Sequence, residues 1–260
     1  MQYLSDRAAG SAGLRALQDW AEAEPGSADP LTVLSRADIA HAWFIRGHAR
    51  AKYVRNDAWP RFFELLGQAD ELAARAADLA PADPTPRATA VHLARGLQVP
   101  RWEFDARWQA LTACDPLHRT GHHHALQYLC AKWSGSHREM TEFAREAADR
   151  APAGHTLTLL PFLADREKWV ADDDGFDSNG LPAHLADIQE RWIDAGPQPH
   201  SRIAEDHSLL AFSMSLIQRR SDAAIHFRAM GRHASTAGWN YSLTPRQAFL
   251  RARSAALRSH

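Results

Sequence analysis

Apolar positions recur every three or four residues along most of the chain, which is the spacing of one face of an α-helix. Alanine and leucine fill many of these positions, whereas the strand-forming residues valine and isoleucine are scarce. Breaks rich in proline, glycine and aspartate separate the periodic segments. The pattern predicts an all-α protein with helices over residues 10–20, 30–54, 61–79, 87–97, 102–113, a helical pair within 116–152, then 154–168, 182–195, 203–219, 222–230 and 246–257.

Proline-containing breaks follow one another at a nearly constant spacing in the first part of the chain. Asp-Pro or Ala-Pro closures fall at Pro81 or Pro84, at Pro116 and at Pro152, at intervals in the range of 32 to 36 residues. Periods of this size are typical of stacked helical hairpins, in which each hairpin buries its apolar face against the next. We therefore expect three helical hairpins over residues 30–152.

The remaining segments follow the period less regularly. Residues 1–29 are expected to form an N-terminal cap, and residues 153–200 an irregular helical insertion with an acidic loop that does not match a calcium-binding loop. The repeat pattern returns in residues 201–260, interpreted as a C-terminal hairpin and a capping helix, because an end repeat must show a polar face to water. The whole chain, 1–260, is interpreted as a single helical domain.

Composition indicates which partners the protein is expected to bind and in which compartment it is expected to lie. The formal net charge is -1, so no overall field attracts nucleic acid or anionic lipid, and we expect neither as a partner. No apolar run approaches the ~20 residues of a membrane span, and Asp6 and Arg7 interrupt any signal peptide. Cys114 and Cys130 form no CxxC pattern, which fits a reducing compartment. We expect a cytoplasmic protein.

Three segments resemble the tetratricopeptide repeat. In 134–152, a loop glycine precedes a helix with small or apolar residues at the spacing of that repeat, and a proline ends it. In 40–51, Trp43 and Gly47 lie where the first helix of the repeat has its tryptophan and its close-packing glycine. The positions that carry the resemblance are Gly135, Met140, Ala144, Ala147 and Pro152, then Trp43 and Gly47, with Ala69, Ala73, Ala76 and Pro81 for the second helix of the first repeat.

The chain also departs from the repeat. The first unit has about ten residues more than the family norm around residues 56–61, and the second has Phe104, Trp108 and Leu111 where the family usually has smaller residues. The segment 133–137, together with Phe143-Ala144-Arg145, is similar to uncharacterised bacterial proteins of the actinobacteria. The resemblance implies a right-handed solenoid of antiparallel hairpins, and it implies no activity.

In tetratricopeptide proteins the first helix of each hairpin lines a concave groove. The resemblance therefore places His41, Phe44, His48 and Lys52 on the groove in the first unit, and His122 and Lys132 in the third. Such a groove usually holds an extended peptide, and histidine, lysine and aromatic side chains together can hold a carboxylate.

Two further kinds of residue are candidates for ligand contact. Arg46, on a partly buried stripe, needs a partner such as a carboxylate of a neighbouring helix or of a ligand. Six of the nine tryptophans are considered as lining an aromatic pocket. We expect Trp133 and Trp239, beside loops, to contact a ligand, and the other four to fill the core: Trp43, Trp102, Trp108 and Trp192.

Fifteen histidines make a metal site worth considering. His118 and His122 lie four residues apart, the spacing at which two helical imidazoles can reach one ion, with Cys130 or Asp115 as a third ligand. Against this, His118 lies at the expected helix start and the glutamate of an HExxH site is missing. Capping or solvated histidines are the simpler interpretation, and no metal or cofactor is predicted.

The sequence leaves the function open between a binding module and an enzyme. It contains no phosphate-binding glycine loop, GxSxG elbow or Cys-His protease pattern, so no catalytic motif supports an enzyme. The first hypothesis is a module that recognises a peptide or protein in its groove. The alternative is a small-molecule binder or cofactor-independent enzyme with a pocket of histidine, tryptophan and arginine closed by residues 165–200. Self-assembly through the exposed ends is a third hypothesis.

Overall fold

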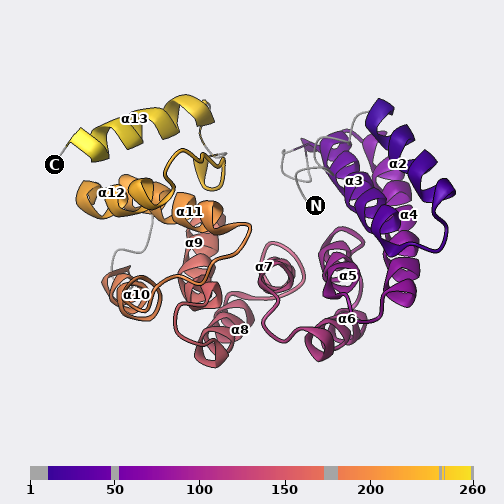
Figure 1. Ribbon diagram of the computed structural model, residues 1–260, viewed down its shortest axis with the longest axis horizontal. Helices are drawn as coiled ribbons and strands as arrows, with labels where there is room; N and C mark the ends of the chain where they lie inside the picture. The colour runs from indigo at the N-terminus through magenta and orange to yellow at the C-terminus, as the bar shows by residue number, and fades with distance from the viewer. Residues whose placement is uncertain (1–10, 48–52, 173–180, 240–241, 243, 259–260) are drawn as a thin grey trace. The chain divides into compact units, whose positions relative to one another are not determined.

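The structure, a computed structural model, describes residues 11–47, 53–172, 181–239, 242 and 244–258. Over these residues the chain forms twelve α-helices and no strand, which confirms the all-α prediction (Figure 1). Among the described helices, none combines the length and the apolar character that a membrane crossing requires.

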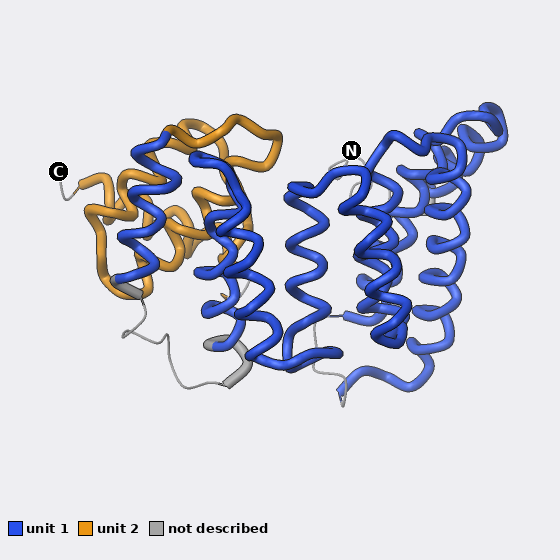
Figure 2. Tube along the Cα trace, turned by 90° about the horizontal axis from the view of Figure 1, so that it is seen from below, with its two compact units in different colours: residues 1–195 blue, residues 196–260 orange. Residues whose placement is uncertain are grey.

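The chain divides into two compact units, Met1–Ala195 and Gly196–His260, coloured separately in Figure 2. The division falls at the Gly-Pro segment that follows the last helix of the predicted insertion. Each unit has a packed interior of its own, so the two are described in turn.

Unit 1 contains the helices that the periodic pattern predicts in residues 10–195, with shifted ends. They are α2 (Ser11–Ala23), α3 (Ala28–Arg46), α4 (Ala58–Leu79), α5 (Pro84–Gly96), α6 (Arg101–Cys114), α7 (Arg119–Tyr128), α8 (His137–Arg150), the 3₁₀-helix η2 (Thr156–Leu159), α9 (Leu160–Asp172), α10 (Leu181–Ile188) and the π-helix η3 (Gln189–Asp194).

The breaks between these helices are closed by local hydrogen bonds. The Asp83 side chain caps α5 by accepting from the Thr85 amide at 2.8 Å, and Pro84 begins the helix with its φ already fixed. At α8, Ser136 accepts from the Glu139 amide at 3.2 Å and donates to the Glu139 carboxylate at 2.9 Å. The connections are therefore encoded locally.

The predicted helix over 30–54 is wrong at its C-terminal end. Helix α3 ends at Arg46, because Gly47 adopts a φ of 74° that terminates the helix. A Cβ on Gly47 would meet nothing within 4 Å, so this glycine is not a close-packing position. Gly96 is such a position, since a Cβ there would lie 2.6 Å from Leu66 Cδ1.

Successive helices of unit 1 pack on one another. Helix α3 packs on α4, α4 on α5, α5 on α6 and also on α7, and α8 on α9. Figure 1 shows α5 and α7 on one side of this row and α6 and α8 on the other. Arg95 contacts Gln127, 32 residues further along, and His92 contacts His124 at the same spacing, so α5 and α7 run parallel.

Unit 2 consists of α11 (Ile203–Leu216), α12 (Arg220–Ala229) and α13 (Pro245–Arg258) around an aromatic core. Trp239 lies in that core with only 3% of its surface exposed. Its ring contacts Phe212 and Phe249 edge to face, and its Nε1–H donates to Ser208 Oγ at 3.1 Å. The tryptophan predicted to contact a ligand therefore fills the interior of unit 2.

Candidate functional site

Unit 1 brings five side chains together around one arginine, Arg95. The guanidinium carbon of Arg95 lies 5.0 Å from the centroid of the Trp43 ring and 5.3 Å from that of the Trp133 ring. The two tryptophans contact each other edge to face at 5.9 Å. Arg46 lies beside them, 5.5 Å from the Trp43 ring. We call Trp43, Arg46, His92, Arg95, His124 and Trp133 the Arg95 cluster.

Trp133 reaches this cluster from the connection between α7 and α8, which is longer than the connection between α5 and α6. Helices α5 and α6 are joined by residues 97–100, whereas α7 and α8 are joined by residues 129–136. Within the longer connection the Trp133 amide donates to the Cys130 carbonyl at 2.9 Å, and Gly135 passes so close to Leu129 that a Cβ would lie 2.2 Å from its carbonyl oxygen. The chain thereby folds back and places Trp133 against Trp43 of α3 and Arg95 of α5.

Arg95 is bound mainly by aromatic rings. Its Nη1 donates to Gln127 Oε1 at 3.5 Å, and its buried Nε has no hydrogen-bond partner among the described residues. Burial lowers the pKa of Arg95 to about 10, with Glu167 acting in the opposite direction. The side chain is charged at neutral pH, and two cation–π contacts offset only part of the cost of removing that charge from water.

A carboxylate that interacts electrostatically with Arg95, that of Glu167, is already engaged. Glu167 of α9 is 8% exposed, accepts from Lys132 Nζ at 2.5 Å, and lies 3.5 Å from Arg166 Nη1. Lys132, predicted to face the ligand groove, is therefore paired within the protein. Glu167 belongs to segment 165–200, which was predicted to close the pocket, and it interacts electrostatically with Arg95.

Two histidines extend the cluster along α5 and α7. The rings of His92 and His124 stack with centroids 3.9 Å apart and planes within 4°. Burial lowers the pKa of both well below the ordinary value, and the charges of Arg95 and Arg36 lower them further. Both rings are neutral at pH 7, and a neutral imidazole offers one N–H donor and one acceptor.

Arg46, which the sequence predicted to need a partner, contacts two tryptophan rings and a backbone carbonyl. Its guanidinium carbon lies 5.5 Å and 5.8 Å from the Trp43 and Trp59 centroids, and Nη1 donates to the Gly47 carbonyl at 3.0 Å. Arg46 and Arg95, near the C-terminal ends of α3 and α5, are the two cationic members of the cluster, and its other members carry no charge at pH 7. Glu167 is bound by Lys132 and Arg166.

His122, predicted to line the groove, packs away from the Arg95 cluster. Its ring packs edge to face on Trp108 of α6 at 4.8 Å and against Phe143 of α8 at 5.8 Å. His124 is two residues further along α7 and therefore lies on nearly the opposite side of that helix, where it stacks on His92 of α5.

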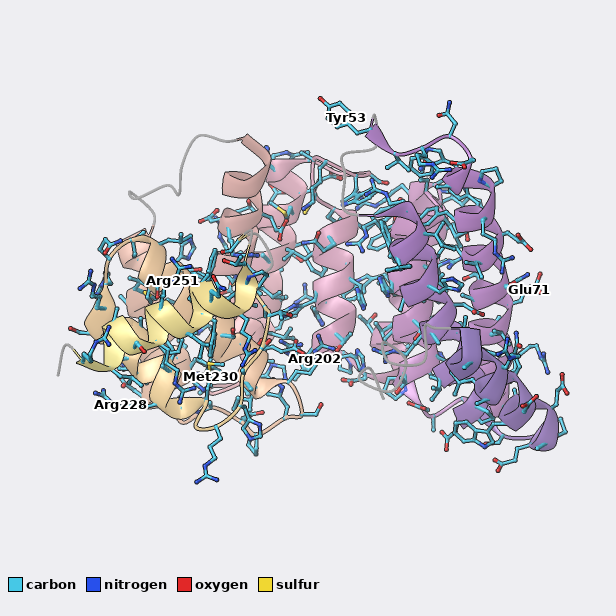
Figure 3. The ribbon with its side chains drawn as sticks, turned by 90° about the horizontal axis from the view of Figure 1, so that it is seen from above. Tyr53, Glu71, Arg202, Arg228, Met230 and Arg251 are labelled. Carbon is cyan, nitrogen blue, oxygen red and sulfur yellow. The ribbon has the colours of Figure 1, made fainter. Side chains whose placement is uncertain are left out.

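The other predicted residues are scattered. His41 is half-buried, and its buried Nδ1 has no hydrogen bond among the described residues, while Phe44 is 82% exposed. His48 and Lys52 lie outside the described residues. Of the tryptophans assigned to the core, Trp192 is fully buried, but Trp102 is 72% exposed, which corrects that assignment. Tyr53 is also exposed, and Figure 3 shows it projecting outward from unit 1.

The two weak candidates for metal ligands, His118 and His122, make hydrogen bonds within α7 and its N-cap. His118 caps α7 by accepting from the Gly121 amide at 3.0 Å through Nδ1, and His122 Nδ1 bonds to the His118 carbonyl at 3.0 Å. In unit 2, His207 and His226 approach to 3.1 Å between their Nδ1 atoms. No group of three or more histidine, cysteine, aspartate or glutamate side chains in the described part of the chain is placed to hold a metal.

Sequence reasoning missed His92, Arg95 and the role of Trp43. A signal was present, since His92 and Arg95 are three residues apart on one face of α5, and His124 and Gln127 repeat that spacing on α7. Comparison of the chain with protein-family models, with curated proteins and with solved structures gave no significant match.

Proposed function

We propose that unit 1 is a binding module built of stacked helical hairpins of the tetratricopeptide kind, which recognises a carboxylate-bearing segment of a peptide or protein partner at the Arg95 cluster. The sequential packing of α3 to α9 and the contacts between α5 and α7 at a spacing of 32 residues support the repeat architecture. Both features are expected of a helical solenoid, in which each hairpin contacts its neighbours.

The observation that carries the proposal is the state of Arg95. A largely enclosed guanidinium normally pairs with a carboxylate, because an unpaired charge is costly away from water. Arg95 has two tryptophan rings, a long contact to an amide and no ion pair within the described residues. A carboxylate of a partner would supply the missing charge, and Arg binds carboxylates in a geometry that lysine cannot match.

The neighbouring groups favour an anion over a cation. Arg46 adds positive charge beside the site, and the N–H groups of His92 and His124 add neutral donors. Trp43 and Trp133 offer flat apolar surfaces on which the rest of an extended segment can pack. This arrangement favours a segment that carries an acidic or C-terminal carboxylate next to an apolar side chain.

Fluorescence anisotropy with labelled decapeptides tests the proposal. One set carries aspartate, glutamate and a free C-terminus, and the matched set carries asparagine, glutamine and a C-terminal amide. We expect saturable binding of the acidic set, weakened at least about tenfold by Arg95→Gln, which removes one charge-assisted contact. Arg87→Gln removes the same charge from the same helix at a site bonded to loop carbonyls, and is expected to change affinity by less than about twofold.

Two results would count against a carboxylate site. One is equal binding of the acidic and the amidated peptides by the wild-type protein. The other is an equal loss of affinity in both arginine variants, which would indicate general charge attraction. Either result removes the Arg95 cluster as the site of recognition, since the proposal requires a specific contact at that guanidinium.

A further inference from the structure

A second feature of unit 1 lies apart from the Arg95 cluster, between α6, α7 and α8. It is a cavity of about 400 Å³ lined by Trp108 and Thr112 of α6, Pro116 and Leu117 of the following turn, His122 of α7, and Phe143, Glu146, Ala147 and Arg150 of α8. This volume is within the range of small-molecule sites in proteins. None of these residues belongs to the Arg95 cluster.

Three rings form the wall of the cavity. Trp108 is nearly perpendicular to His122 at 4.8 Å and contacts Phe143 at 5.3 Å. Edge-to-face packing of this kind fixes the rings and leaves flat surfaces of Trp108 and Phe143 as walls. Ala147, the small residue on α8, makes room between them. A planar aromatic molecule complements such walls better than a branched aliphatic one.

His122 gives the cavity one defined polar group. Its Nδ1 faces a carbonyl oxygen, that of His118, so Nδ1 must carry the proton and donate. Burial lowers the pKa of His122 to about 4, and the hydrogen bond to the His118 carbonyl opposes that shift only in part, so the ring is neutral at pH 7. The outer nitrogen, Nε2, therefore has a free lone pair and can only accept.

The mouth of the cavity is electrically balanced. Arg150 donates to Glu146 Oε2 at 2.8 Å, and both side chains are about 70% exposed. Because each charge cancels the other, the rim selects neither an anion nor a cation. From the aromatic wall, the acceptor nitrogen of His122 beside it and the balanced rim, we infer that this cavity binds a neutral, planar aromatic molecule that donates one N–H or O–H hydrogen bond to His122 Nε2.

The inference does not depend on the proposed function, since it uses other residues, other chemistry and another ligand class. The cavity is a candidate small-molecule site, and it differs from the pocket that the sequence predicted under residues 165–200. Peptide binding at Arg95 and aromatic binding at His122 can therefore succeed or fail separately.

The test uses the full chain and two probes of nearly equal shape, indole and benzothiophene, of which only indole has an N–H donor. Saturation-transfer NMR titrations are expected to give saturable binding of indole, and binding of benzothiophene weaker by about threefold to tenfold, the usual net worth of one hydrogen bond. His122→Phe keeps the ring and removes the acceptor, so it should bring the two probes to equal affinity.

A matched pair of variants locates the site. Thr112 and Thr141 are both half-buried helix threonines whose hydroxyls donate to the carbonyl four residues earlier, at 3.0 and 2.8 Å, but only Thr112 lines the cavity. Thr112→Phe should weaken indole binding by more than about tenfold by filling the space, and Thr141→Phe should leave it within about twofold. Intermolecular NOEs from indole to the Ala147 methyl group locate the probe in the wild-type protein without any substitution.

Absence of saturable indole binding would overturn the inference, as would NOEs that place indole elsewhere. Equal affinity of the wild-type protein for the two probes would refute the role of His122. Unchanged binding by a folded Thr112→Phe protein, verified by its far-ultraviolet circular dichroism, would exclude this cavity as the site.

Discussion

The buried His122 makes a quantitative prediction about acid stability. Only 4% of its surface is exposed, and its pKa in the folded protein is about 4, against an ordinary value of ~6.5 in an unfolded chain. The folded state therefore favours the neutral ring. The stabilisation is fully present above the unfolded-state pKa and is lost as the pH falls from about 6.5 toward 4.

The magnitude follows from the two pKa values. At pH 5 the unfolded chain has taken up its proton and the folded ring has not, so His122 alone lowers the free energy of unfolding by about 2 kcal/mol relative to pH 7.5. Other buried histidines, His92, His124 and His226 among them, have lowered pKa values and act in the same direction. The contribution of His122 alone must therefore be measured by comparing the wild-type protein with variants at this position.

The assay is urea unfolding at pH 7.5 and pH 5.0 for the wild-type protein, His122→Asn and His122→Phe. Both variants lose stability at both pH values, because the ring and its hydrogen bond change. Their loss between pH 7.5 and pH 5.0 should nevertheless be smaller than that of the wild type by about 2 kcal/mol, since neither residue titrates. An identical loss in all three proteins would refute the burial argument.

Three further predictions follow from packing and charge in unit 1, each measured as the free energy of unfolding. Arg107→Ala should cost about 2–3 kcal/mol, because it leaves two partly buried carboxylates unpaired, whereas Arg101→Ala, whose pairs are more exposed, should cost less than about 1 kcal/mol. Equal losses would contradict this. Gly121→Ala should destabilise by about 1–3 kcal/mol, since its Cβ would lie 2.2 Å from a leucine methyl, and Gly67→Ala, with open space around it, should stabilise by about 0.5–1 kcal/mol. The same sign for both would disprove the packing argument. Burial raises the pKa of Asp38 to about 6, so its stabilising contribution is lost as the pH rises from about 4 to 6, and the asparagine variant should gain up to about 3 kcal/mol at pH 7. If the asparagine variant is no more stable than the wild type at pH 7, interactions within the protein offset the cost of burying the ionised Asp38 carboxylate, and the prediction fails.

The sequence by itself determined where the chain is helical and where it turns. Hydrophobic spacing defined the helices, and caps such as Asp83-Pro84 and Ser136 with Glu139 defined their starts, because these signals act over a few neighbouring residues. The spacing of the proline breaks also predicted hairpin-sized units. The contacts of α5 with α7 at 32 residues agree with that spacing.

Only the tertiary structure decided which side chains meet. Two histidines of α7 contact different helices: His122 packs on Trp108 of α6, and His124 stacks on His92 of α5. The rotation of α7 about its axis determines which neighbouring helix each residue faces. Trp43 and Trp133 come from distant segments and converge on Arg95 only because the connection after α7 is long enough to fold back. Periodicity shows that a face is buried. The partner across that face depends on how the helices pack, and no local pattern encodes it.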